Sequence, residues 1–311
     1  MALNKAMLAA LKAVSYTDID VQRTYKLQRQ LYNVVHYPLL KPFYKTWDHR
    51  IEAGGREIPV RLFMPETEKP EWLIVFYHGG GWVTGSIDSY TGVCVRLAKH
   101  TGALVLSVDY RLAPEHRFPC AAEDCYLAAL EVFRHAQRTL HIPPERILLM
   151  GDSAGGNLAA VVSLMAHDRR TFTPAGQILL YPATYFDHTE ASPFASVREN
   201  GTDYLLTSKR VEDYMTLYQR TPEDRRNPYF APLLAEDLSG QPRTLILTAE
   251  FDPLRDEGEA YGEKLQQAGV EARVIRIADG LHGFFSLPSQ FAPVQESYRH
   301  IQQFLSEVPC K

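Results

Sequence analysis

The sequence predicts a doubly wound α/β fold, in which helices cover both faces of a mostly parallel β-sheet. From residue 72 onward, helical stretches alternate with short hydrophobic runs: WLIVFYH, ALVLSVDY, RILLMG, GQILLYP, TLILTAE and EARVIRI. Nearly continuous hydrophobic strands between helices are typical of a parallel sheet buried on both faces. The chain has 311 residues and is 45% hydrophobic, so it can bury a core of this size.

The N-terminal region, residues 1–45, is expected to form helices that belong to a cap. One apolar stripe at helical spacing runs along MALNKAMLAALKAVSY, formed by Leu3, Met7, Leu8, Leu11 and Val14. Lys12 interrupts the apolar run, so an amphipathic helix fits this segment better than a secretion signal does.

Two strands and then the sheet core are predicted to follow. WDHRIEAGG and REIPVRLFMP read as strands around a turn at Gly54 and Gly55, which makes a hairpin at one edge of the sheet. Helices are expected between the later strands, at roughly 90–100, 120–138, 155–167 and 257–268. These elements assign residues 46–184 and 239–311 to the core. Residues 185–238 are too long for a simple connection, so we expect a helical cap insertion there.

Charge, cysteine content and hydropathy narrow the function. The net charge is −4, with Lys and Arg scattered along the chain, so nucleic acid is not an expected partner. The cysteines show neither metal-ligand spacing nor the density of a disulfide framework, so reduced thiols are expected at Cys94, Cys120, Cys125 and Cys310. No run approaches the roughly 18 apolar residues of a membrane span. A cytoplasmic protein without a metal or cofactor is therefore expected.

Residues 150–162, MGDSAGGNLAAVV, contain a serine in a setting shared by two unrelated groups of serine hydrolases. Chymotrypsin-like proteases carry GDSGG, and certain esterases carry GDSAGG. Here a predicted strand precedes Ser153 and a predicted helix follows it, which places the serine on a sharp, strained turn. Gly151 and Gly155 suit this turn, because strand and helix cross closely there. The context favours an α/β hydrolase over an all-β protease.

Chain order supports the same conclusion, because α/β hydrolases run serine, acid, histidine. Asp252 and His282 each follow a predicted strand, at the sheet edge where Ser153 lies. His282 is expected to accept the serine proton and return it to the leaving alcohol, while Asp252 orients the imidazole. Three other carboxylates are nearby, at Glu250, Asp256 and Asp279. Glu250 is interpreted as structural and Asp256 as the acid that opens a helix.

The glycines of FYHGGGWVTG are expected to form an oxyanion hole. Consecutive glycines let backbone N–H groups turn toward a developing negative charge, with Gly79 and Gly80 as the best donors and Ala154 completing the set. His78 is expected to hydrogen-bond its own loop rather than transfer protons. Trp82 fits equally well as a wall of the acyl pocket or as a packing residue.

Five motifs together resemble the bacterial hormone-sensitive-lipase-like esterases, and within them the acetyl esterases. They are HGGGW (78–82), DYRLAPEHRFP (109–119), GDSAGGNLA (151–159), DPLRDEG (252–258) and HGF (282–284). In the second motif we expect Arg111 and Glu115 to form a structural ion pair and a turn. The resemblance runs from about residue 72 to the end, and departs conservatively at Leu281, where many relatives have methionine. The N-terminal region and the insertion carry no matching motif.

The resemblance implies an α/β-hydrolase core with a helical cap and hydrolysis of carboxylic esters, usually with short acyl chains. Position by position, it assigns the triad and oxyanion donors to Ser153, Asp252, His282, Gly79, Gly80 and Ala154. The expected enzyme is a serine carboxylesterase that forms an acyl-enzyme with a small acetyl to butyryl ester. The sequence does not give the natural ester or the oligomeric state, for which a homodimer is the default.

Two other functions stay open on the sequence. A peptidase or amidase could use the same residues, although oligopeptidases of this fold usually carry an extra large domain and none is expected here. A non-catalytic ligand-binding protein is the second alternative, because plant gibberellin receptors resemble this family. Those receptors have lost the catalytic histidine, whereas His282 is present.

Overall fold

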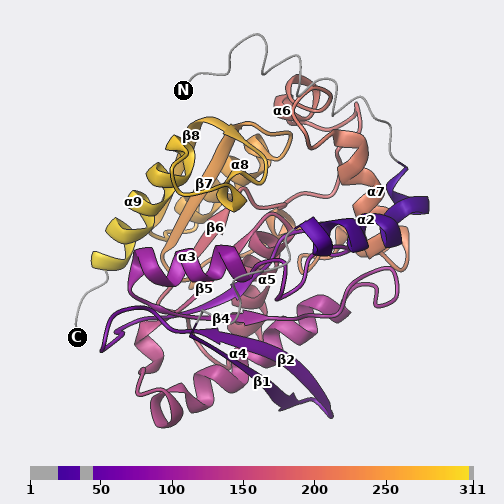
Figure 1. Ribbon diagram of the computed structural model, residues 1–311. Helices are drawn as coiled ribbons and strands as arrows, with labels where there is room; N and C mark the ends of the chain where they lie inside the picture. Colours follow the sequence, from indigo (N-terminus) through magenta and orange to yellow (C-terminus); the bar gives the residue numbers. More distant parts are fainter. Residues whose placement is uncertain (1–19, 36–44, 308–311) are drawn as a thin grey trace.

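The computed structural model describes residues 20–35 and 45–307, and its strands form one sheet in the order β1-β2-β4-β3-β5-β6-β7-β8 (Figure 1). All neighbours from β4 to β8 pair in parallel, whereas β1 pairs antiparallel with β2, and β2 with β4. The predicted mostly parallel sheet is thus confirmed. The strands are β1 (Thr46–Ala53), β2 (Arg56–Phe63), β3 (Leu73–Tyr77), β4 (Leu104–Val108), β5 (Ile147–Asp152), β6 (Gly176–Leu180), β7 (Thr244–Phe251) and β8 (Ala272–Leu281).

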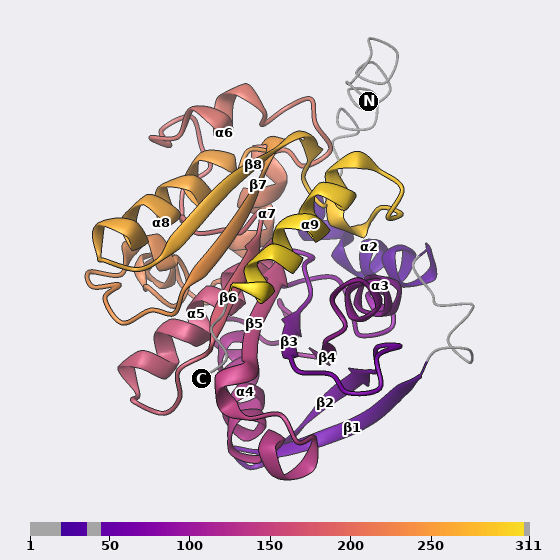
Figure 2. The same cartoon turned by 90° about the vertical axis from the view of Figure 1, so that its left-hand side faces the viewer.

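Helices cover both faces of the sheet (Figure 2). One face carries α3 (Thr91–Thr101) and α9 (Ala292–Ser306), and the other carries α4 (Cys120–Thr139), α5 (Ala154–Asp168) and α8 (Arg255–Gln267). Strand β3 shows why both layers are needed, because all of its side chains are buried. Val75 packs into the core on the α5 side, while Ile74 and Phe76 pack into the core on the α3 side. The sheet is therefore buried on both faces, as its continuous hydrophobic runs indicate.

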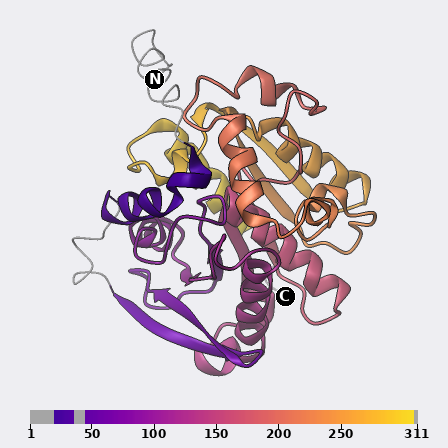
Figure 3. The ribbon, with the colours of Figure 1, turned by 90° about the vertical axis from the view of Figure 1, so that its right-hand side faces the viewer.

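The N-terminal hairpin is found where the sequence predicts it. Gly54 and Gly55 make the turn between β1 and β2 with φ values of 58° and 76°, a region that glycine enters without steric cost. Strand β1 lies at the edge of the sheet (Figure 3). The predicted helical stripe over residues 3–14 and the thiol of Cys310 lie outside the described residues. The described cysteines, Cys94, Cys120 and Cys125, are free thiols.

Residues 185–238 contain two helices, α6 (Ala195–Glu199) and α7 (Ser208–Tyr218), and two short 3₁₀ helices, Pro222–Arg226 and Pro232–Leu234. Helix α7 lies beside α2 (Val21–Val35), as Figure 3 shows in orange and indigo. The amide of Gln22 on α2 donates a 2.8 Å hydrogen bond to Asp213 on α7. Within residues 20–35 and 45–307, no helix combines the length and the apolar composition that crossing a membrane requires.

The ion pair predicted between Arg111 and Glu115 does not form. The guanidinium of Arg111 instead contacts Asp124 on α4, with Nε 2.7 Å from Oδ2, and Glu115 pairs at 3.0 Å with Arg29 on α2. Asp124 is only 2% exposed, and a buried carboxylate needs counter-charges, which Arg111 and Arg56 supply. Both residues of the motif are structural as predicted, but each has a partner distant in sequence.

Candidate active site

Ser153 occupies a sharp turn between β5 and α5. Its φ of 56° lies in a region that non-glycine residues rarely adopt, which is the strained backbone expected of a nucleophile at this type of turn. The neighbouring glycines are required by space. A Cβ atom added to Gly151 would lie 2.2 Å from the carbonyl oxygen of Gly155, and one added to Gly155 would lie 1.9 Å from that of Tyr77.

His282 and Asp252 complete a hydrogen-bonded relay with this serine. Oγ of Ser153 lies 2.8 Å from Nε2 of His282, and Nδ1 of His282 lies 2.7 Å from Oδ2 of Asp252. The serine follows β5, the aspartate follows β7 and the histidine follows β8, so three parallel strands deliver them to one edge of the sheet. With the proton on Nδ1 held by the carboxylate, Nε2 is free to accept the serine proton.

Asp252 is held in place by its own loop. Its side chain is fully buried, and Oδ1 accepts a 2.9 Å hydrogen bond from the N–H of Leu254. Two of the other carboxylates considered from the sequence, Glu250 and Asp256, are engaged elsewhere. Glu250 accepts the N–H of Asp279 at 2.8 Å, and Asp256, in the first turn of α8, accepts the N–H of Ser196 at 2.7 Å. Asp252 is therefore the carboxylate that reaches the histidine.

The glycine loop after β3 differs from the prediction at one position. The N–H of Gly79 donates a 2.9 Å hydrogen bond to Oδ1 of Asp152, so it is not free to bind an oxyanion. Gly80, Gly81 and Ala154 instead line the cavity in front of Ser153. The sequence prediction took the first two glycines of the run as donors. It could not tell which N–H groups face the cavity, because the direction of an N–H in an irregular loop follows no periodic pattern. We therefore replace Gly79 by Gly81 in the candidate donor set.

His78 and Trp82 flank these glycines and are both buried. Nδ1 of His78 donates a 2.8 Å hydrogen bond to the carbonyl of Gly79, and burial lowers the pKa of this imidazole. His78 therefore shapes the loop as a neutral group. Trp82 combines the two roles considered for it, because it lines the cavity and also stacks on Tyr218 with ring centroids 4.6 Å apart.

A family model described as the alpha/beta hydrolase fold matches residues 74–286. The chain belongs to the hormone-sensitive-lipase-like α/β hydrolases. This membership confirms the resemblance seen in the five motifs. The matched region includes the glycine loop, the serine turn, and the loops that carry Asp252 and His282.

Several relatives of this hydrolase are named as esterases or ester hydrolases. A carboxylic ester hydrolase of Mycobacterium tuberculosis is 41% identical over 77% of the chain, and the match spans 64% of that relative. An ethyl acetate hydrolase of Pseudomonas putida is 36% identical over 81% of the chain and 79% of its own length. A solved structure of a hyperthermophilic esterase from Pyrobaculum calidifontis is 37% identical, covers 99% of the chain and 98% of its own, and gives a TM-score of 0.84. The comparisons place the chain among carboxylic ester hydrolases.

The cavity in front of Ser153 has a volume of about 250 Å³ and is bounded by segments from both ends of the chain. The sequence did not identify its outer wall, which consists of Tyr32 on α2 and of Leu206, Val211 and Tyr214 in the insertion. These apolar and aromatic residues carry no motif, because they are ordinary helix and loop residues until the fold brings them together. Helical periodicity in α7 was the available signal, but it does not say which face lines a cavity.

Asp152 is a second residue that the sequence did not single out. It precedes Ser153 in the chain, is 3% exposed and lines the cavity. Its Oδ2 accepts a 2.9 Å hydrogen bond from the hydroxyl of Tyr90. Burial raises the pKa of this carboxyl to about 6, against the hydrogen bonds from Tyr90 and Gly79, which lower it. A titratable group thus joins the serine turn to the glycine loop.

Proposed function

We propose that this hydrolase is a serine carboxylesterase that cleaves esters of short acyl chains, acetyl to butyryl, through an acyl-enzyme. The observation that carries the proposal is the relay of Ser153, His282 and Asp252 opening into a cavity of about 250 Å³. Pockets for drug-sized ligands usually occupy about 300–1,000 Å³, so a volume below this range favours small acyl groups. The named ethyl acetate hydrolase among the relatives is consistent with this choice.

The geometry supports a two-step reaction. Oγ of Ser153 attacks the ester carbonyl while Nε2 of His282 takes the hydroxyl proton, and Asp252 stabilises the imidazolium that forms. The negative charge on the carbonyl oxygen faces the N–H groups of Gly80, Gly81 and Ala154. His282 then gives the proton to the leaving alcohol, which leaves an acyl-Ser153. Water then attacks the acyl-enzyme, with His282 taking its proton and returning it to Ser153, and the carboxylic acid is released.

The first prediction tests this function with p-nitrophenyl esters. We expect kcat/KM to be highest for acetate to butyrate and to fall for octanoate and decanoate. Ser153→Ala should lower kcat by about 10⁴-fold or more, because the nucleophile is lost. Ser286→Ala removes a hydroxyl from the same cavity wall and should retain most of the activity.

Two further measurements separate the alternatives. A small fluorophosphonate should label the wild-type protein and Ser286→Ala but not Ser153→Ala; a wild type that resists labelling would fit the ligand-binding protein. Faster turnover of aminoacyl anilides than of matched esters would identify a peptidase or amidase. Absence of ester hydrolysis by the pure wild-type protein would refute the proposed function.

A further inference from the structure

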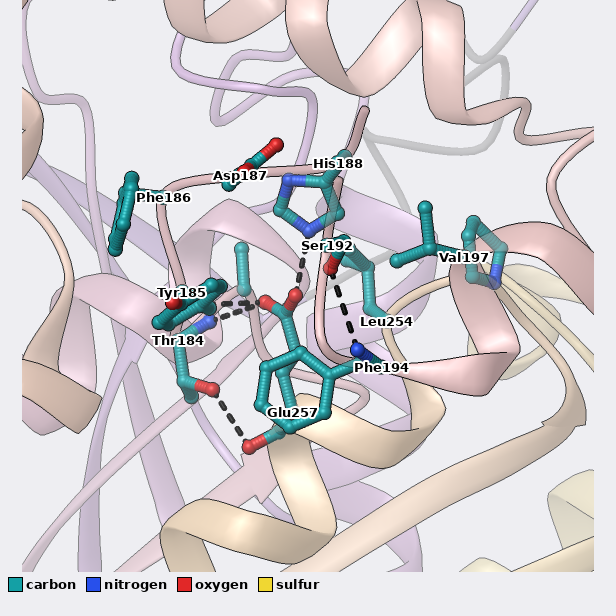
Figure 4. Close-up of polar contacts among 12 residues, drawn as sticks. Thr184, Tyr185, Phe186, Asp187, His188, Ser192, Phe194, Val197, Leu254 and Glu257 are labelled. Atoms are coloured by element: carbon teal, nitrogen blue, oxygen red, sulfur yellow. Dashed lines mark hydrogen bonds and ion pairs between the residues drawn. The ribbon is translucent and has the colours of Figure 1, made fainter. Parts of the chain in front are cut away.

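A second pair of acid and base lies buried outside the relay and takes no part in the reaction above. Nε2 of His188 is 2.5 Å from Oε2 of Glu257, and both side chains are fully buried (Figure 4). His188 belongs to the insertion, and Glu257 to the first turn of α8, the helix that follows Asp252. Burial of a charged pair is costly unless the remaining hydrogen-bonding atoms of both side chains have partners.

Glu257 binds the point where the chain leaves β6 and enters the insertion. Its Oε1 accepts the backbone N–H groups of Thr184 at 2.6 Å and Tyr185 at 3.1 Å, as Figure 4 shows. The hydroxyl of Thr184 donates in addition to the backbone carbonyl of Glu257 at 2.8 Å. Both carboxylate oxygens therefore have hydrogen-bond partners, as buried polar groups require.

His188 continues the connection to helix α7. Its backbone N–H donates a 2.7 Å hydrogen bond to Oε1 of Glu212 on α7, and Oε2 of Glu212 pairs with Arg225 at 2.6 Å. Nδ1 of His188 is buried, makes no hydrogen bond with the described residues, and lies 3.9 Å from Oε1 of Glu212. A line of alternating charges thus runs from α8 through His188 to the outer side of α7.

Both ends of this line reach the walls of the substrate cavity. Helix α7 carries Val211 and Tyr214, which line the cavity, and the Tyr214 ring lies so close that a Cβ on Gly81 would be 2.4 Å from its Cγ. At the other end, Leu254 lines the same cavity and donates its N–H to Asp252. The buried pair and its hydrogen bonds therefore connect the segments that carry these two walls.

We propose that His188 and Glu257 are positioning residues that hold the α7 wall of the cavity against the catalytic loop and thereby set the limit on acyl length. Neither side chain touches the substrate, so the pair acts on binding rather than on proton transfer. This inference rests on the proposed esterase function, because it concerns which acyl group the cavity accepts.

The charges around His188 make the connection sensitive to pH. Burial alone lowers the pKa of the imidazole, but Glu257 from α8, Glu212 from α7 and Asp187 from its own segment raise it, so the net shift is upward. Arg225 neutralises Glu212 from the far side. A histidine whose pKa is raised on folding stabilises the fold fully below its unfolded value of about 6.5, and loses this contribution as pH rises through the folded value. The wall should therefore loosen at alkaline pH.

The second prediction concerns acyl preference, and it is tested by measuring KM and kcat for the acetate, butyrate, hexanoate and octanoate esters. His188→Gln keeps an N–H donor but removes the charge, and we expect it to raise KM for butyrate by about tenfold, with kcat changed by less than about threefold. The preference for butyrate over octanoate should weaken. The rise of KM with alkaline pH in the wild type should disappear in the variant. His135→Gln removes an exposed histidine that pairs with Glu131 on α4 and should change none of these values.

A second variant keeps the inference testable if His188→Gln folds poorly. Glu212→Gln weakens the same line at a partly exposed position, and it should shift acyl preference in the same direction by a smaller factor. Unchanged KM, acyl profile and pH dependence in a folded variant would overturn the inference, as would an equal loss of kcat for all esters. Wild-type hydrolysis and fluorophosphonate labelling decide the proposed function separately, since neither depends on the variants.

Discussion

Asp152 shows how one buried carboxylate can serve both the fold and the site. Its two oxygens hold the N–H of Gly79 and the hydroxyl of Tyr90, so it ties the glycine loop to the turn that carries Ser153. The donors proposed for the oxyanion come from both of these segments. We propose that Asp152, by joining these two segments, positions the oxyanion donors without being one of them.

The third prediction concerns this residue and pH. Burial raises the pKa of Asp152 from 3.8 to about 6, so between these values the folded protein binds more protons than the unfolded chain. Its contribution to stability is therefore complete below about pH 4 and is lost as pH rises to about 6. The shift is worth about 3 kcal/mol at most. Asp152→Asn removes the titration.

Thermal unfolding of the wild type and Asp152→Asn from pH 4 to 7 measures the effect. The melting temperature of the variant should rise relative to that of the wild type across this range, while kcat falls because an amide cannot accept from both donors. A constant difference in melting temperature across the range would contradict the raised pKa.

At the scale of elements, the strand, turn and helix around Ser153 were predictable because each part leaves a local signal. The hydrophobic run marks β5, the glycines mark the turn, and parallel pairing brings Asp252 and His282 to the same edge. The choice between Gly79 and Gly81 was not predictable. It depends on where Asp152 points, which is a tertiary contact.

The insertion was predictable only as an interruption of the alternating pattern. Its length indicated structure of its own, but Tyr214 and His188 carry no spacing that distinguishes them from surface residues. Glu257 lies in the DPLRDEG motif (252–258), so the sequence could have marked it as a candidate functional residue. Its burial and its contacts with Thr184 and Tyr185 required the structure.

The fourth prediction tests the crossing of β5 and α5. A side chain at Gly155 would lie 1.9 Å from the backbone oxygen of Tyr77, and backbone cannot move aside as a flexible side chain does. We expect Gly155→Ala to lose about 100-fold or more in kcat/KM, since displacement of the turn by about 1 Å spoils the geometry of attack.

Gly92→Ala is the matched control for this prediction. Gly92 lies on α3, where an added Cβ would meet only the end of the Arg96 side chain at 3.4 Å. Alanine is favoured over glycine in a helix by about 0.5–1 kcal/mol, so this variant should be active and slightly more stable. Comparable activity losses in the two variants would show that the crossing at Gly155 is not special.

At the scale of the whole molecule, the catalytic relay and the residues proposed to limit acyl length lie in different parts of the structure. The relay is built from loops after β5, β7 and β8 of one continuous sheet, whereas the outer cavity wall comes from α2 and the insertion. The sheet is buried on both faces by two helical layers, and close packing of this kind resists small displacements. Helix α7 also packs Met215 and Tyr218 into the core on the α5 side, and the buried pair at His188 adds a polar connection between the insertion and α8.

This division leads to the fifth prediction, a double-mutant cycle within residues 185–238. Tyr214→Ala should admit longer acyl chains, because it removes a ring from the cavity wall beside Gly81. The free-energy effects of substitutions at residues that act through one element are not additive, whereas the effects at distant, independent sites are. We therefore expect the effects of His188→Gln and Tyr214→Ala on kcat/KM for octanoate to fall short of the product of the single effects.

The shortfall should be about threefold or more, which corresponds to a coupling above about 0.6 kcal/mol. Pairing His188→Gln with Gly92→Ala provides the control, because α3 covers the face of the sheet opposite α5 and α8. Those two effects should multiply within error. If His188 and Tyr214 also proved independent, the α7 wall would not move as one body, and the limit on acyl length would have to arise at each wall residue separately.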